Sequence, residues 1–168
     1  VMARRQRQMC IRDRFKDFKG SENLYSAFYI NELINFLITQ SEESVELFDI
    51  YKNCISNLKD NASIENILRN FELDLLGVLG YEINFSTEYG TNNDIDYGLK
   101  YKYSPQSGFS KSTDGFDGKI LNEISKRSFS RDALVASKEI NRKTIEYYFE
   151  ELNICLLYTS PSPRDNGR

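Results

Sequence analysis

The chain contains no histidine, and its three cysteines, Cys10, Cys54 and Cys155, lie far apart. Histidine is the commonest general base and the commonest metal ligand, so its absence argues against a hydrolase. A zinc site takes about four ligands, usually cysteine or histidine, and this chain cannot supply them. Sparse cysteines also fit a reducing compartment. We therefore expect a cytoplasmic, non-enzymatic protein without metal or other cofactors.

Long apolar segments are missing as well. No apolar run approaches the roughly 20 residues that a membrane-spanning helix needs, and no apolar stretch follows the basic N-terminus as it would in a signal peptide. Apolar residues make up 40% and charged residues 28% of the 168-residue chain. These proportions are ordinary for a globular protein, so we expect one domain with a modest core.

The two ends of the chain differ from its body. The stretches QMCIRDR and LLYTSPSPRD resemble translated sequencing-adaptor read-through, so residues 1–14 and 156–168 are predicted to be disordered scars. The alternative for the first stretch is a basic arm that binds nucleic acid. The body, residues 15–155, holds 15 basic and 23 acidic side chains, a net charge of −8. Such a body repels a phosphate backbone unless its cations gather on one face.

Hydrophobic periodicity predicts five helices in this body. A serine is placed to cap three of them, and Gly80 is placed to end the third. Apolar stripes that include Phe28, Phe48 and Cys54 are expected to face the core. The predicted helices cover residues 22–38, 45–58, 64–79, 118–126 and 131–152, with Ser21, Ser63 and Ser130 as candidate caps.

Residues 81–118 interrupt the helical pattern, because Asn, Asp, Gly, Ser and Tyr dominate there. Residues 98–103 alternate between large apolar side chains and lysines, which predicts a strand, and residues 109–112 can return beside it. Two strands alone are marginally stable, so this hairpin must lean on the helices. The expected fold class is mainly α, a helical bundle-like domain with a small β-hairpin insertion at about residues 97–112.

Two sequence motifs are informative. They are NLYSAFYINEL at residues 23–33 and LRNFELDLLGVLGY at residues 68–81. The first resembles the YxNEL helix and the second the RFEL…LLxxLGY helix of the RecO family of bacterial recombination mediators. The resemblance covers roughly residues 18–152. It implies a fragment that contains the family's helical C-terminal domain and lacks the OB-type barrel before it.

The resemblance implies a role in DNA repair and recombination. RecO proteins bind and anneal DNA strands, engage the tail of the single-stranded DNA-binding protein SSB, and act with RecR to load RecA. In this fragment it implies docking of SSB and RecR, with single- and double-stranded DNA bound mainly by the missing domain. Some relatives hold a four-cysteine zinc element at the place of residues 84–118, where this chain has no cysteine. The alternatives are a helical interaction scaffold without a nucleic-acid role and a hydrolase with paired carboxylates.

Arg69 is the leading candidate for a protein-binding residue. In the family, the arginine of this motif is expected to help hold the acidic SSB tail. A guanidinium suits that task because it grips a carboxylate in bidentate fashion. We expect Arg69 to face solvent and to act with Lys52 at a pocket between the second and third helices. The alternative is a weak surface ion pair with Glu65 or Glu72.

Two further groups of residues each allow two interpretations. Glu32 and Glu72 lie beside apolar stripes, and a structural role is preferred over a catalytic pair. Lysines alternate with aromatic residues in the predicted hairpin, so Lys100, Lys102, Tyr101 and Tyr103 are candidate nucleic-acid contacts through base stacking. The preferred alternative is that these aromatic rings pack on the helices.

Overall fold

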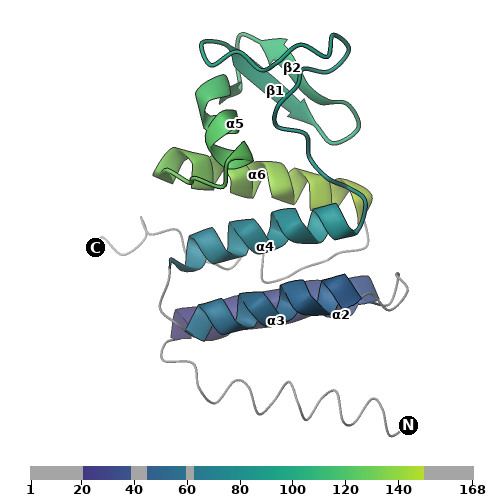
Figure 1. Cartoon of the computed structure of the whole chain (residues 1–168), viewed down its shortest axis with the longest axis vertical. Helices are drawn as coiled ribbons and strands as arrows, with labels where there is room; N and C mark the ends of the chain where they lie inside the picture. The colour runs from purple at the N-terminus through teal and green to yellow at the C-terminus, as the bar shows by residue number, and fades with distance from the viewer. Residues whose placement is uncertain (1–20, 39–44, 60–62, 150–168) are drawn as a thin grey trace, which may run out of the picture. The chain divides into compact units, whose positions relative to one another are not determined.

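The structure, a computed structural model, describes residues 21–38, 45–59 and 63–149 (Figure 1). The predicted scars at residues 1–14 and 156–168 lie outside these ranges. The described chain forms two compact units, which divide between Ile64 and Glu65. Each unit is described by itself.

The first unit contains helices α2 (Ser21–Ile38) and α3 (Val45–Lys59), which pack against each other. The amide of Asn23 donates a hydrogen bond of 2.7 Å to the carbonyl oxygen of Leu58. Cys54 is buried, as predicted. Phe28 and Phe48 are 44% and 56% exposed, so their predicted place in the core is wrong. Other residues of the predicted stripes are buried, and the buried faces of the two helices include Ala27, Ile30, Leu33, Leu47, Ile55 and Leu58.

Helix α4 (Ile64–Val78) belongs to the second unit from Glu65 onward, and Gly80 lies in the turn that ends it, as predicted. Gly80 has a φ of +82°, which favours glycine. The amide of Tyr81 donates to the carbonyl of Leu76 at 2.8 Å, and that of Gly80 donates to Gly77 at 3.0 Å. This pair of bonds is the Schellman arrangement, which satisfies carbonyls at the end of a helix.

A small antiparallel sheet follows in the order β2-β1-β3. Its strands are β1 (Lys100–Ser104), β2 (Gly108–Ser112) and β3 (Phe116–Asp117). The fold class is confirmed, since helices dominate and the predicted hairpin is present. The hairpin is not the whole sheet, however, because β3 pairs with the other side of β1. A strand of two residues is too short to show alternation, so the sequence pattern did not indicate it.

Helices α5 (Gly118–Ser125) and α6 (Arg131–Tyr148) complete the unit. Ser130 caps α6 as predicted, because its hydroxyl accepts a hydrogen bond of 3.3 Å from the amide of Ala133. Helix α6 ends at Tyr148, earlier than the predicted residue 152, with Phe149 as its C-cap. In Figure 1, α6 lies between α4 on one side and α5 with the sheet on the other.

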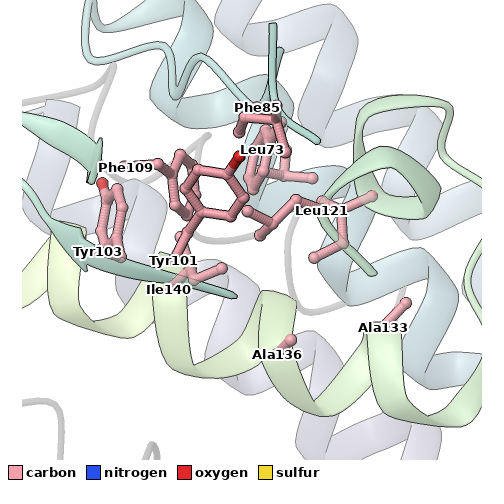
Figure 2. Packing of buried hydrophobic residues seen from close by; sticks show 11 residues of the cluster. Leu73, Phe85, Tyr101, Tyr103, Phe109, Leu121, Ala133, Ala136 and Ile140 are labelled. Carbon is pink, nitrogen blue, oxygen red and sulfur yellow. The ribbon is translucent and has the colours of Figure 1, made fainter. Parts of the chain in front are cut away.

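The core of the second unit joins one face of the sheet to these helices, as Figure 2 shows. Tyr101 and Phe109 project from neighbouring strands, and both rings are almost fully buried. The cluster consists of Leu73, Phe85, Ile95, Tyr101, Tyr103, Phe109, Leu121, Ile124, Ala133, Ala136 and Ile140.

The segment between α4 and β1 is held by side-chain and backbone hydrogen bonds. The side-chain oxygen of Asn84 accepts from the amides of Ser86 and Thr87 at 2.9 and 3.3 Å. Glu88 is buried, and its Oε2 lies 3.2 Å from both the Lys111 ammonium and the Thr91 hydroxyl. The segment also pairs with β2, since the amide of Tyr89 donates to the carbonyl of Phe109 at 2.7 Å.

Gly118, the first residue of α5, approaches another part of the backbone closely. A Cβ atom at this position would lie 2.0 Å from the carbonyl oxygen of Asp96. Gly118→Ala is therefore expected to lower the free energy of unfolding by about 1–3 kcal/mol, the usual cost of overpacking. Urea denaturation measures this loss. The matched control is Gly77→Ala, because that helical glycine has open space around it, and it should gain about 0.4–1 kcal/mol. Equal effects of the two variants would contradict the prediction.

Candidate protein-docking site

Arg69 lies on α4 and is buried, with 6% of its surface exposed. The prediction that it faces solvent is therefore wrong. Its Nη2 donates to Oε1 of Glu72 at 2.8 Å, so the two side chains form the ion pair that was the alternative reading. The pair is buried, however, and burial makes such a pair sensitive to the loss of either partner.

Glu72 connects α4 to α6. Its second oxygen, Oε2, accepts a hydrogen bond of 3.0 Å from the Nδ2 of Asn141, which is fully buried on α6. Nδ2 of Asn141 also lies 3.4 Å from the hydroxyl of Ser137. The predicted structural role of Glu72 is thus confirmed. Two buried atoms, Nε of Arg69 and Oδ1 of Asn141, have no hydrogen-bond partner among the residues that the structure describes.

The other residues predicted for docking or catalysis lie in the first unit. Lys52 is exposed on α3, whereas Arg69 belongs to the second unit. The predicted pocket that would join Lys52 and Arg69 therefore stays a prediction. Glu32 is half-buried on α2, so Glu32 and Glu72 are also in different units.

The strand residues divide into two faces. Tyr101 is fully buried and Tyr103 is 7% exposed, so neither ring can stack on a base, and that part of the prediction is wrong. The alternative, rings packed on the helices, is correct. Lys100 and Lys102 are exposed on the other face, and Lys100 lies 3.9 Å from Asp117. A contact of these two lysines with nucleic acid remains a prediction.

Neither a metal centre nor a membrane span is visible in the described part of the chain. No cluster of three or more acidic or cysteine side chains in residues 21–38, 45–59 and 63–149 is placed to hold a metal ion. The helices within these ranges are too short or too polar to cross a bilayer.

Comparison with known proteins gives the family. Residues 20–147 match the family model described as "Recombination protein O C terminal". The chain belongs to the RecO family. Similar proteins are named "DNA repair protein RecO". Those of Pseudoalteromonas translucida, Salmonella gallinarum and Shigella flexneri are 36%, 38% and 37% identical over 128, 131 and 131 residues. The matches cover 74% of this chain in each case and 55%, 54% and 54% of the relatives. The chain thus spans about half the length of the relatives it matches.

Two polar residues of this RecO-family unit were missed in the sequence. Asn141 lies on the apolar face of α6 beside Ile140 and Ile145. A polar residue on such a face indicates a buried polar contact, so the sequence did carry a signal for it. Arg127, just after α5, has a φ of +55°. Its guanidinium donates to the Asp74 carboxylate at 2.8 Å. Nothing in the local pattern predicts that long-range contact.

Tyr103 of this RecO-family chain provides a pH-dependent contribution to stability. Burial raises the pKa of its phenol above 10.0, a bond with Thr144 partly lowers it, and nearby Tyr148 raises it. The two hydroxyls lie 2.7 Å apart. Since the folded chain keeps this proton longer than the unfolded chain, the contribution is complete below about pH 10 and falls as pH rises beyond it. Tyr103→Phe should therefore flatten the loss of stability above pH 10 in urea denaturation. An unchanged slope would contradict the assignment.

Proposed function

We propose that this chain is a non-enzymatic part of a cytoplasmic DNA repair and recombination protein, and that it docks protein partners. The first partner is an acidic peptide that ends in an aromatic residue, as expected for the SSB tail. RecR is the second, and together they support RecA loading and strand annealing. The family match and the shared name of the relatives support the repair role.

The observation that carries the docking proposal is the state of Arg69. The guanidinium is fixed by one bond to Glu72, while its buried Nε has no partner among the described residues. A fixed guanidinium is suited to a carboxylate, because little conformational entropy is lost when the ligand binds. Lys52 on α3 of the first unit is a separate candidate for contact with an acidic peptide.

The test is a fluorescence anisotropy titration with a labelled acidic peptide that has a C-terminal aromatic residue. Arg69→Lys keeps the positive charge but loses the planar donor pattern. It should weaken binding by about 1–3 kcal/mol, the range for hydrogen bonds to charged groups and the penalty of losing them. Lys138→Ala, which removes an exposed cation on α6, is the control and should bind normally. Equal binding by wild type and Arg69→Lys would refute the role of Arg69.

A second candidate function is contact with the backbone of single- or double-stranded DNA through Lys100 and Lys102. The observation that favours it is that both lysines project from the exposed face of β1. Phosphate contacts of this type weaken with salt and do not depend on base identity. Loss of both lysines should therefore reduce binding equally for different DNA sequences. If the double alanine variant binds DNA as well as wild type, the lysines have no such role.

A further inference from the structure

Two Asp-Gly steps follow each other closely between β2 and α5. Asp114–Gly115 lies in the bend after β2, and Asp117–Gly118 joins β3 to α5. In such a step the backbone nitrogen of the glycine can attack the side-chain carboxyl group of the aspartate, because no side chain on the glycine shields that nitrogen. The product is a five-membered succinimide ring. Both steps have the same residue types, so the fold decides which of them reacts.

The second step is locked by the fold. The amide of Gly118 donates a hydrogen bond of 2.8 Å to the carbonyl oxygen of Leu99, and Gly118 is buried as the first residue of α5. Ring closure also requires Cβ of the aspartate to eclipse the glycine nitrogen about the Cα–C bond. Asp117 has a φ of −68° and a ψ of 137°, which is far from that arrangement. A reaction at Asp117 would therefore have to break the start of α5.

The first step is open. Asp114 and Gly115 are both exposed. Neither the Asp114 carboxylate nor the Gly115 amide has a hydrogen-bond partner among the residues that the structure describes. The amide of Asp114 itself makes a long bond of 3.3 Å to the hydroxyl of Ser112. Exposed backbone with so few bonds opens locally at little cost in free energy, so this bend can reach the conformation that closes the ring.

We propose that Asp114 is a site of spontaneous isomerisation to isoaspartate, and that the fold protects Asp117 from the same reaction. The nitrogen of Gly115 forms a bond to Cγ of Asp114 and loses its proton, while the carboxyl group loses its hydroxyl, so that one water molecule leaves. Water then adds to the ring. Addition at Cγ restores aspartate, whereas addition at the former backbone carbonyl gives isoaspartate, in which the main chain runs through Cβ and Cγ. The reaction requires no docking partner.

The isomerisation lengthens the main chain where the backbone fits tightly. Gly115 lies close to β1, since a Cβ atom on it would be 2.3 Å from the carbonyl oxygen of Tyr101. The next residue, Phe116, pairs with Tyr101 in the sheet and packs against the core cluster. An extra main-chain atom just before Gly115 therefore displaces β3 from the edge of β1. The isomerised protein is expected to unfold at a lower urea concentration.

The test is an incubation of the whole protein at neutral pH and physiological temperature, followed by a brief trypsin digestion. Trypsin cleaves after Lys111 and Lys119, so both steps lie in one peptide, STDGFDGK. Electron-transfer fragmentation of this peptide identifies which residue has isomerised. Isoaspartate should accumulate at Asp114 and stay several-fold lower at Asp117. The same peptide made synthetically has no fold to protect it, and both of its aspartates should isomerise at similar rates.

Two variants provide matched controls. Asp114→Glu adds one methylene group, so ring closure would need a six-membered ring, which forms more slowly. Isomerisation at this position should be lost, and the fold should be kept because the side chain is exposed. Asp117→Glu makes the same change at the protected step and should leave the accumulation at Asp114 as it is in the wild type.

The outcomes decide both parts of the proposal. Equal accumulation at the two aspartates of the folded protein would overturn it, and so would no isoaspartate at Asp114 under conditions in which the synthetic peptide converts. For the structural consequence, the isomerised protein is separated from the unmodified protein by ion-exchange chromatography, and both are unfolded in urea. A lower midpoint is expected for the isomerised form. Equal midpoints would overturn the displacement of β3.

Discussion

Replacing Glu72 with alanine should lower the free energy of unfolding by about 3–5 kcal/mol, the usual cost of breaking a buried ion pair on one side. The variant leaves the guanidinium of Arg69 buried without its 2.8 Å partner. It also removes the acceptor for Asn141, and with it this link between α4 and α6. Urea denaturation followed by circular dichroism measures the loss.

Two controls separate the ion pair from other effects on α4. Glu65→Ala removes an exposed acid from the same helix and should change stability by less than about 0.5 kcal/mol. The double variant Arg69→Met/Glu72→Met removes both charges and should recover much of the loss, because no buried charge is left unpaired. If Glu72→Ala were as mild as Glu65→Ala, the buried pair would not be a determinant of stability.

Replacing Tyr101 with alanine should cost about 3–5 kcal/mol, as for other large aromatic residues in a core. The ring is fully buried in the cluster of Figure 2. Its hydroxyl also accepts a hydrogen bond of 2.9 Å from the amide of Asp96. Tyr101→Phe keeps the ring and loses this bond, so it should cost about 1 kcal/mol. Thermal or urea unfolding of both variants distinguishes burial from hydrogen bonding.

The neighbour of Tyr101 supplies the control. Lys102 is exposed on the opposite face of β1, so Lys102→Ala should stay within about 0.5 kcal/mol of wild type. If Tyr101→Ala were equally mild, the assignment of the inner face of the sheet would be incorrect. Lys102→Ala and Tyr101→Phe also test function. If β1 contacts DNA, the affinity for DNA should fall in Lys102→Ala and stay unchanged in Tyr101→Phe.

The positions of the helices were predictable, because each carries a 3.6-residue pattern that burial on one side produces. The burial of Arg69 was not predictable from that pattern. Leu68 and Phe71 indicated one apolar face, yet α4 is also buried at Arg69, Glu72 and Leu73. Periodicity identifies a single stripe, and a helix buried on more than one side has polar residues in places that the pattern assigns to solvent.

The hairpin was predictable for a similar reason, and so were its faces. Alternation shows that Tyr101 and Lys102 point to opposite sides, and the preferred interpretation, with the aromatic rings packed on the helices, is correct. The segment before β1 carries no periodic signal. It is fixed in part by the ion pair of Glu88 with Lys111, two residues whose proximity only the folded chain reveals.

The pairing of Tyr89 with Phe109 has a consequence for self-association. Strand β2 is at the edge of the sheet, and an edge strand offers free backbone groups on which another chain can extend the sheet. Here the carbonyl of Phe109 is already occupied by the amide of Tyr89, and Lys111 adds a charge further along the strand. Opening of this segment would expose a template for intermolecular strands, so conditions that weaken the Glu88–Lys111 pair should favour aggregation before the helices unfold.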